Sequence, residues 1–548
     1  MLALTRGIMP TGLAALAGLQ AVPLPGSPAA AAPTFDLHLP WQLLGALGPD
    51  LLLVVGAIGL MVWAAWRPES AGHQRRVGEL SLWLVVATAA AVLAYAARHL
   101  TAEPGVIAVD AFRWAADLIF LVATFATIAL SMDYNAREGI TSGESHVLVL
   151  FATSGMMLLA AARDLMLVFL GIELMSIAVY VLAGLNRRSA RSAEAALKYF
   201  LLGAFSTGFL LYGIALLYGA TGSTTLTEIG DRIHQYGLGA APLITVGLAL
   251  LLVGFAFKVA AAPFHMWAPD VYEGAPTPIT GYMAAAVKAA AFAAFIRIWV
   301  EAFPEVVYHW HNAIWFLAVL TMFVGNIVAL VQRNIKRLLA YSSIAQAGYV
   351  LVAVVSGTTL GASAFLFYLA AYTLATMGAF AVVVALGDRG ETNLDIDEYA
   401  GLWTTQPWLA LAMSVCMLAL LGFPVFGGLG FLAKWYMIQA ALQAQYLGQP
   451  TPQVMLAVMI VLTSVISAGY YLRLVTIMFM RPRHPDRTTA ALAVRPGALT
   501  ESVVVVSVVL LLALGLVPAY LVNWSARSVP AITQRPVYVL PSAGSGTP

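Results

Sequence analysis

The run AAPLITVGLALLLVGFAFKVAAA, residues 240–262, contains a single charged side chain, Lys258. An α-helix needs about 20 predominantly apolar residues to cross the hydrocarbon core of a bilayer, and this run is long enough to do so. It leads into Pro263 and then His265, so a helix formed by the run meets a residue that interrupts helices. The stretch therefore predicts a membrane-spanning helix with a break and a lysine beside that break.

The composition of the whole chain resembles that of this run. Of 548 residues, 61% are hydrophobic and 10% are charged, whereas a soluble globular protein has about 25% charged residues. The net charge of +2 provides no basic field for nucleic acid. The single cysteine, Cys416, cannot by itself form an internal disulfide, a thiolate zinc site or an iron–sulfur cluster. These features exclude an ordinary soluble enzyme, a disordered protein and a nucleic-acid binder, and they leave a polytopic membrane protein.

Fourteen apolar stretches of this kind follow one another. They are continuous rather than alternating, which favours helices over a transmembrane β-barrel. One of them, 406–446, is too long for a single crossing and contains Gly422, Pro424 and Gly427, so we expect one helix broken in its middle. The expected spans are 44–66, 79–97, 108–132, 146–162, 164–184, 195–219, 240–262, 279–302, 312–332, 338–356, 362–386, 406–446, 453–480 and 499–523.

The distribution of Lys and Arg predicts the orientation. Of the 28 basic side chains, fifteen lie in loops that follow odd-numbered spans, six lie in even-numbered loops and the tails, and seven lie within spans. By the positive-inside rule, the odd-numbered loops are cytoplasmic, and both termini lie on the periplasmic side of a bacterial inner membrane. Residues 1–40 are either a signal-like segment or a terminal extension. The tail from Pro530 is rich in Pro, Gly and Ser, and we expect it to be flexible.

Basic side chains within the spans need a reason, because each costs about 2.5–3.5 kcal/mol at the bilayer centre on insertion scales. Arg113 has Asp110 three residues before it and Asp117 four after it, so we expect a satisfied structural ion cluster on one helix face. Arg297 and Arg473 lie near span ends, and we expect both to extend to the membrane interface.

Four ionisable side chains do not fit these explanations. Glu173 and Lys288 lie near the middle of their spans, and Lys258 and Lys434 lie beside helix breaks. A buried lysine can be switched between its charged and neutral forms by moving one neighbouring charge, which is what a proton relay requires. We therefore interpret these four residues as functional.

On spacing alone, Lys198 is structural and His265 remains open. Lys198 lies near a predicted cytoplasmic span end with Glu194 four residues before it, which indicates a structural ion pair. His265 comes seven residues after Lys258, and on an unbroken helix the two would share a face. A relay role and a hydrogen-bonded core histidine are equally compatible with that position.

Several motifs resemble those of a known family. The sequence resembles the antiporter-like membrane subunits of respiratory complex I over about residues 44–523. The motif DVYEGAPTP, together with Lys at position 434, is most similar to the subunit N branch. The motifs that carry the resemblance are GIELMS (171–176), AALKYFLLGA (195–204), FKVAAAPFHMWAPDVYEGAPTP (257–278), QRNIKRLLAYSSIAQ (332–346) and FLAKW (431–435).

This resemblance implies an all-α fold of about 14 transmembrane helices. Helices 4–8 and helices 9–13 would form two five-helix repeats of inverted topology, and helices 7 and 12 would be broken. The implied divisions are an extension at 1–40, helices 1–3 at 41–145, the first repeat at 146–311, the second repeat at 312–480, and helix 14 with a tail at 481–548.

The resemblance also implies a function, which is proton translocation coupled to electron transfer from NADH to quinone. FMN and iron–sulfur clusters would be bound by partner subunits, and this chain would hold no cofactor and no metal. Its partners would be the other membrane and peripheral subunits of complex I and the lipid bilayer, with quinone as the substrate of the whole complex.

The resemblance assigns a proton relay to individual residues. Glu173 would modulate Lys258, the central proton carrier at the break, and separation of this pair would release a proton toward Lys288. The relay implied by the resemblance consists of Glu173, Lys198, Lys258, His265, Lys288 and Lys434.

Three other functions stay open. A subunit of a multisubunit cation/proton antiporter shares the implied fold, although the wording of residues 271–278 favours complex I. A redox protein with its own haem would need two deep histidines, and only His265 is expected to be deep. The pattern GLGFLA (428–433) resembles a dinucleotide-binding motif, but no strand precedes it. A purely structural membrane anchor would not need four deep ionisable residues.

Overall fold

The computed structural model describes residues 41–98, 105–391, 393–424, 428–446, 449–482 and 497–529, with the side chains of 41–43 left out. The chain divides into two compact units, Met1–Gly45 and Ala46–Pro548. Helix α1 (Trp41–Ala46) begins the described chain, and the architecture below is that of the second unit. The predicted extension at 1–40 and the predicted tail from Pro530 lie outside the described residues.

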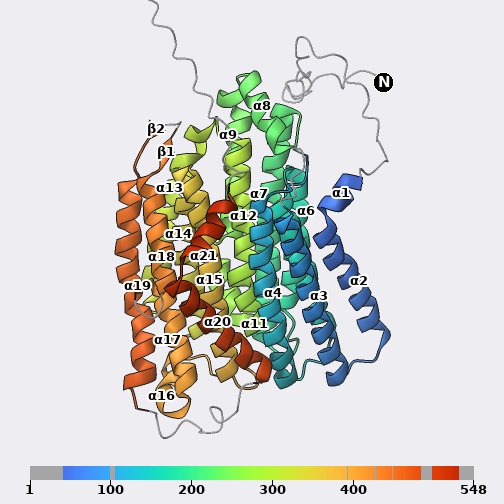
Figure 1. Cartoon of the computed structure of the whole chain (residues 1–548), viewed down its shortest axis with the longest axis vertical. Coiled ribbons are helices and arrows are strands. Elements are labelled where there is room, and N and C mark those ends of the chain that lie inside the picture. The colour runs from blue at the N-terminus through green and yellow to red at the C-terminus, as the bar shows by residue number, and fades with distance from the viewer. Residues whose placement is uncertain are drawn as a thin grey trace, which may run out of the picture. The chain divides into compact units, whose positions relative to one another are not determined.

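The second unit is a bundle of α-helices (Figure 1). A two-residue antiparallel pair, β1 (Gln445–Tyr446) and β2 (Gln449–Pro450), is its sheet structure within the described residues. The helices are α2 (Gly48–Trp66), α3 (Ala71–Ala97), α4 (Ala111–Glu138), α5 (Glu144–Ala161), α6 (Leu165–Ala183), α7 (Ala190–Thr221), α8 (Leu226–Gln235), η1 (Leu238–Ala240), α9 (Pro242–Lys258), α10 (Trp267–Gly274), α11 (Thr277–Tyr282), η2 (Met283–Val287), α12 (Lys288–Ala302), α13 (Val307–Ala329), α14 (Ile335–Ser356), α15 (Thr359–Leu386), η3 (Ile396–Tyr399), α16 (Leu402–Thr405), α17 (Pro407–Leu421), α18 (Gly428–Leu442), α19 (Val454–Met480), α20 (Ala498–Leu516) and α21 (Ala519–Arg527).

The apolar stretches of the sequence form long helices. Among the described residues, twelve helices are long and apolar enough to cross a membrane, and α9 and α17 are two shorter apolar helices. These two are the first halves of the two stretches that we expected to be broken. The all-α membrane fold is confirmed, whereas the inverted relation between the repeats stays a prediction.

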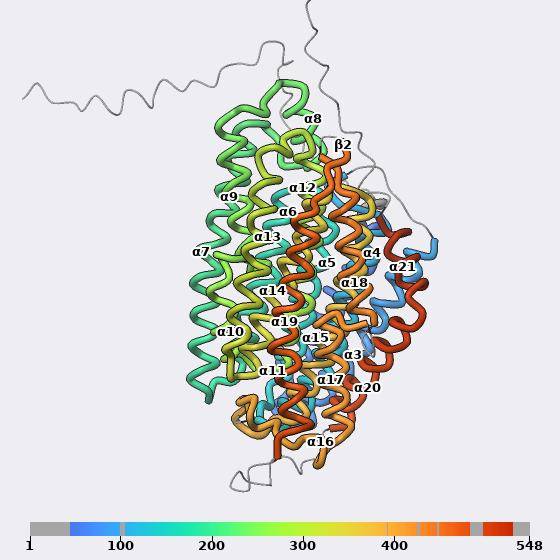
Figure 2. The backbone as a smooth tube through the Cα atoms, turned by 90° about the vertical axis from the view of Figure 1, so that its left-hand side faces the viewer, coloured from blue at the N-terminus to red at the C-terminus, as the bar shows by residue number. Residues whose placement is uncertain are grey.

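The helices divide into a buried centre and an exposed rim. Within an apolar window of 18 residues, 94% of the residues are buried in the span formed by α11, η2 and α12, 94% in α14 and 89% in α15, whereas the share is between 22% and 28% in α2, α3 and α20. Figure 1 shows α2 and α3 on one flank of the bundle and α19 on the opposite flank. Figure 2 shows α7 on another side of the bundle, where it packs against α9. The rim therefore offers apolar side chains to lipid or to partner subunits.

The two ends of the bundle differ in the elements that they carry. Helix α8 and the β1–β2 pair lie at one end, which we call the α8 end, and α16 lies at the other, which we call the α16 end (Figure 1). The α16 end carries the loops that follow odd-numbered spans, so the positive-inside rule predicts it to be cytoplasmic.

Both predicted helix breaks are confirmed. Helix α9 ends at Lys258, and α10 begins at Trp267 after an irregular segment. This break starts before Pro263, at a point where Ala260 has a φ of 56°, so proline is only part of its cause. Helix α17 ends at Leu421, followed by Gly422 with a φ of 80°, a left-handed conformation that favours glycine.

A third irregularity was not predicted. Residues Met283–Val287 form a turn of π-helix between α11 and α12, directly before Lys288. Such turns shift the register of the side chains that follow them, and they are frequent at functional sites.

The expectation that Arg297 extends to the membrane interface is wrong. Its side chain is fully buried, and it forms ion pairs with Asp110 at 2.8 Å and Glu301 at 2.9 Å. Two carboxylates packed against the guanidinium replace the water that it would otherwise need. Arg473 is half-buried and donates to the backbone carbonyl of Leu330 at 3.3 Å.

Candidate functional site

Lys258 is held at the first helix break. It is the last residue of α9, and its side-chain amine donates to Ser176 Oγ at 2.8 Å and to Tyr180 Oη at 3.3 Å, both on α6. The residue is only 4% exposed. The carbonyl end of a helix favours a positive charge, so ending α9 at this residue stabilises an ammonium that hydrocarbon would otherwise disfavour.

Glu173 does not form the expected ion pair with Lys258. Glu173 lies on α6 one turn before Ser176, it is half-buried, and its Oε1 accepts no hydrogen bond from the described residues. The amine of Lys258 instead contacts the hydroxyls of Ser176 and Tyr180, one and two turns further along the same helix. The Lys258 amine, which extends from α9, therefore contacts α6 beyond Glu173, and the carboxylate and the amine form no ion pair.

Lys288 is held by a single neighbouring residue. Lys288 directly follows the π-turn. Its amine donates to two oxygens of Ser343 on α14, the backbone carbonyl at 2.7 Å and Oγ at 2.5 Å. It is 4% exposed, and in the described part of the chain it forms no ion pair. A buried ammonium with only neutral acceptors is weakly stabilised compared with one in an ion pair.

Lys434 occupies the second helix break. Its amine donates to the carbonyl of Leu421, the last residue of α17, at 2.8 Å and to Ser464 Oγ at 3.0 Å. It also lies 4.6 Å from the centre of the Tyr349 ring, a cation–π contact. The free carbonyl groups at the end of α17 carry partial negative charge, so this break itself binds a lysine amine, whereas at the first break the amine is bound by hydroxyls of α6.

Polar side chains fill the space between Lys288 and Lys434. Gln346, on α14, donates to the carbonyl of Leu420 at 3.0 Å and accepts a hydrogen bond from Tyr368. A cavity of about 10 Å³ lies among Gln346, Tyr368 and Lys434, about the volume that one water molecule requires. Gln346 lies in the motif of residues 332–346 but was not predicted to be functional, although an amide in an apolar span is itself a signal.

Lys198 lies in an open cavity near the α16 end. It forms ion pairs with Glu194 at 2.8 Å, as its spacing predicted, and with Asp270 at 2.9 Å, which was not predicted. The cavity has a volume of about 200 Å³, and Glu273 also lines it. Lys198 is half-exposed, so water reaches it directly, unlike the three deep lysines.

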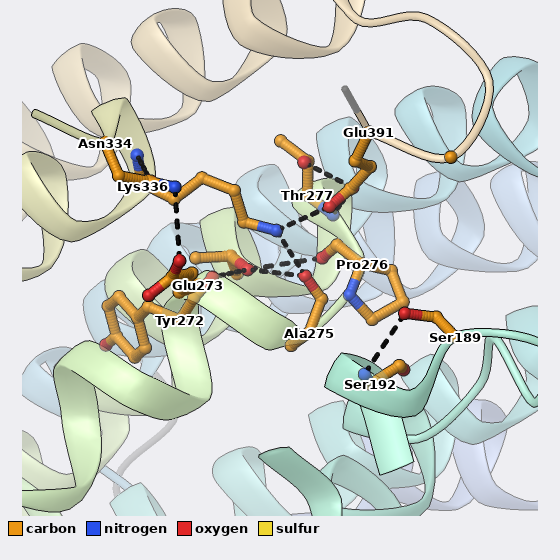
Figure 3. Close-up of polar contacts among 12 residues, drawn as sticks. Ser189, Ser192, Tyr272, Glu273, Ala275, Pro276, Thr277, Asn334, Lys336 and Glu391 are labelled. Atoms are coloured by element: carbon orange, nitrogen blue, oxygen red, sulfur yellow. Dashed lines mark hydrogen bonds and ion pairs between the residues drawn. The ribbon is translucent and has the colours of Figure 1, made fainter. Parts of the chain in front are cut away.

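A second charged cluster, which was not predicted from the sequence, joins the first turn of α14 to the loops around it (Figure 3). Lys336 donates to the carbonyl of Ala275 and forms an ion pair with Glu391 at 2.8 Å. Thr277 donates its backbone N–H and its hydroxyl to the same carboxylate, at 2.9 and 2.6 Å. Burial by itself raises the pKa of Glu391, but the Lys336 charge and these hydrogen bonds outweigh it, so the pKa lies below its usual value.

His265 lies in the irregular segment after α9. It is half-buried, its ring centre is 6.5 Å from that of Tyr341, and its Nδ1 makes no hydrogen bond with the described residues. The chain between Lys258 and His265 is not helical, as the predicted break requires, so the two residues do not share a helix face. The relay role of His265 stays a prediction.

The geometry separates two kinds of lysine. Lys198 forms ion pairs in water, whereas Lys258, Lys288 and Lys434 are buried and donate to hydroxyl and carbonyl oxygens. Each of the three can give up a proton without leaving a carboxylate unpaired. Among the described residues, no group of His, Cys, Asp and Glu side chains could hold a metal ion.

The chain matches a known protein family and its members. Residues 162–467 match the family described as "NADH:quinone oxidoreductase/Mrp antiporter, TM". "NADH-quinone oxidoreductase subunit N" of Gemmatimonas aurantiaca is 49% identical over 498 residues, which cover 89% of this chain and 93% of that relative.

Solved structures are similar to the chain as well. A chain of respiratory complex I from Thermus thermophilus is 37% identical, with a TM-score of 0.71, and the match covers 88% of this chain and 100% of that one. A chain of the Mrp complex from Dietzia has a TM-score of 0.77 over 90% of this chain and 98% of its own, but at 22% identity it shows likeness of fold alone.

Proposed function

The chain belongs to the NADH:quinone oxidoreductase/Mrp antiporter membrane family, among the subunit N proteins of NADH-quinone oxidoreductase, and from this premise we propose how it works. It is a membrane subunit of the bacterial enzyme that moves protons while partner subunits pass electrons from NADH to quinone. FMN and iron–sulfur centres belong to those partners. The α16 end faces the cytoplasm, and the α8 end faces the periplasm.

One observation carries this proposal. Three lysines within the predicted spans, Lys258, Lys288 and Lys434, are buried, and their amines contact neutral oxygens. A purely structural charge in hydrocarbon is normally paired with an opposite charge. An amine bound only to hydroxyls and carbonyls costs less to deprotonate, so it suits a group that is charged in one step and neutral in the next.

The proposed proton route takes the lysines in the following order. A proton enters through the cavity around Lys198 at the α16 end and reaches Lys258 at the first break. A shift of charge beside Glu173 changes how strongly Lys258 holds its proton, because Coulomb energies between nearby charges amount to several kcal/mol at low effective dielectric. The proton then moves through Lys288 and the polar region around Gln346 to Lys434.

The test uses the reconstituted complex with Lys258→Met, which keeps an unbranched side chain that is one atom shorter and has no titratable amine. We expect assembly and a large loss of proton pumping with NADH and quinone, while NADH oxidation by an artificial acceptor is unchanged. Arg473→Gln, at a half-buried arginine that within the described part of the chain bonds only to backbone carbonyls, is the matched control and retains pumping. Full pumping by Lys258→Met would refute the proposal.

A second candidate function is exchange of a cation for protons, which the likeness of fold to the Mrp complex favours. The same preparation separates the two. Sodium-dependent proton exchange in vesicles without NADH or quinone would support the antiporter, whereas strict dependence on electron transfer supports the redox-coupled function.

A further inference from the structure

A buried network of charges lies at the end of the bundle opposite the entry cavity. It joins α2, α4 and α12 and the loop between α5 and α6, close to α8, against which α12 packs. None of the lysines of the proposed relay belongs to it. We call it the α8-end cluster, and its members are Asp50, Asp110, Arg113, Asp117, Arg163, Arg297 and Glu301.

Half of the cluster is a well-paired ionic chain. Arg297 donates to both carboxylate oxygens of Asp110, at 2.8 and 3.0 Å, and to Glu301 at 2.9 Å. Arg163 donates to the other oxygen of Glu301 at 2.9 Å. Asp110 also caps α4 by accepting the backbone N–H of Arg113 at 2.8 Å. In this half, each carboxylate receives hydrogen bonds from a guanidinium.

The other half contains a carboxyl group, that of Asp117, in which both oxygens lack a hydrogen bond from the described residues, whereas Asp50 lacks one at Oδ1 only. Arg113 is fully buried and donates to Asp50 and to the carbonyl of Ala108 at 2.9 Å. Asp117 is also fully buried, and its nearest charged partner is Arg113 Nε, at 3.6 Å. Neither carboxyl oxygen of Asp117 accepts a hydrogen bond from the described residues. The expectation of a satisfied cluster around Arg113 is therefore wrong at this residue.

A count of charges explains why Asp117 differs from the others. The cluster contains four carboxyl groups and three guanidinium groups, and guanidinium groups do not lose their proton in proteins. If all four carboxyls were ionised, one negative charge would be buried without compensation, which is costly. One bound proton makes the cluster neutral, and Asp117 is the one carboxyl that receives no hydrogen bond from an arginine.

A short chain of hydroxyls leads from the centre of the bundle toward this residue. Tyr282, directly before the π-turn, lies 2.7 Å from Thr153 Oγ1, which lies 2.7 Å from Thr124 Oγ1. Thr124 and Asp117 are seven residues apart on α4, so they share a face about 10 Å apart. At the far side of the cluster, the side chains of Asp50 and Asp110 are 10% exposed.

We propose that the α8-end cluster is a second proton-binding site, in which Asp117 holds one exchangeable proton on the way to the α8-end surface. The groups that act on it electrostatically are Arg113 on its own helix, Asp50 on α2, Asp110 at the start of α4 and Arg297 on α12. The binding of the proton stands on the charge count alone. Its release during turnover rests on the proposed function of the chain.

The experiment compares Asp117→Asn with Asp110→Asn in the assembled complex. An amide resembles a protonated carboxyl, so Asp117→Asn assembles with wild-type thermal stability, whereas Asp110→Asn loses assembly because it leaves Arg297 with one carboxylate. Infrared difference spectra between wild type and Asp117→Asn at neutral pH contain the C=O band of a protonated carboxyl. Asp117→Asn also lowers the number of protons pumped per electron.

A pair of threonine variants tests the route to the site without changing a charge. Thr124→Val removes a hydroxyl of the chain and lowers pumping, whereas Thr127→Val, at a buried threonine whose hydroxyl donates to its own helix, retains it. Absence of the protonated carboxyl band, or wild-type pumping by Asp117→Asn, would overturn this inference. If Lys258→Met abolishes pumping while Asp117→Asn pumps normally, only the second site fails. If both variants pump fully, the proposed function fails as well.

Discussion

Replacing Lys288 by methionine separates a structural from a proton-carrying role. The amine makes two hydrogen bonds to Ser343, at 2.7 and 2.5 Å, between α12 and α14. Methionine has a similar length and fills the same space without a charge. If the lysine serves to join the two helices, its loss destabilises the bundle. If it carries a proton, its loss stops pumping with little effect on stability.

The magnitudes limit how much stability the substitution can cost. A hydrogen bond from a charged group contributes about 1.5–3 kcal/mol, so the two bonds contribute about 3–6 kcal/mol together. An ammonium at membrane depth costs about 2.5–3.5 kcal/mol on insertion scales. The carbonyl of Ser343 lies within α14 and keeps its bond in that helix. Lys288→Met therefore costs between about zero and 3.5 kcal/mol of stability.

The assay measures three quantities on one purified complex in vesicles. We expect Lys288→Met to assemble, to keep NADH oxidation by an artificial acceptor, and to lose most of its proton pumping. Ser343→Ala, which keeps the carbonyl acceptor and removes only the hydroxyl, is the graded control and loses less. A Lys288→Met complex that pumps at the wild-type ratio of protons to electrons would refute the reasoning, and a complex that falls apart would show that the lysine is structural.

Three further outcomes test the surroundings of the site. A methyl group at Gly155 would lie 2.5 Å from the backbone nitrogen of Met175, so Gly155→Ala pushes α5 away from α6 and lowers the free energy of unfolding by about 1–3 kcal/mol. The control is Gly208→Ala, whose methyl group meets nothing within 4 Å; it should leave the melting temperature unchanged. Because the pKa of Glu391 lies below its usual 4.5, its ionised form stabilises the fold at neutral pH, and that contribution is lost as the pH falls from 4.5 through the lowered pKa. Glu391→Gln should therefore remove the part of the fall in melting temperature at acid pH that is due to this group. An unchanged fall would contradict the assignment. Ser176→Ala removes an acceptor of the Lys258 amine and should lower pumping without loss of assembly, so unchanged pumping would show that this contact is not used.

Much of the fold follows from the chain because hydrocarbon imposes simple requirements. Long apolar runs predict the spans, proline directly after one of them predicts the break beside Lys258, and glycine and proline within another predict the break near Lys434. The cost of a buried charge identifies the deep ionisable residues without any knowledge of their neighbours. These inferences use properties of local sequence, and local sequence is sufficient for them.

The partners of those charges could not be predicted, because they come from distant segments. Lys258 bonds to α6, Lys288 to α14, and Arg297 to Asp110, which precedes it by 187 residues. The position of His265 relative to Lys258 could not be predicted either, since the helix ends before His265 and spacing rules apply only within a helix. The π-turn before Lys288 has no signal in its sequence of small apolar residues, MAAAV.

The most direct test of the central claim is a map of ordered water inside the intact complex at a resolution that shows single molecules. The account predicts a water in the small cavity beside Gln346, Tyr368 and Lys434, and further waters that join it to Lys288 and Lys258. A dry interior, with the three amines separated by apolar side chains and no bridging solvent, would contradict it.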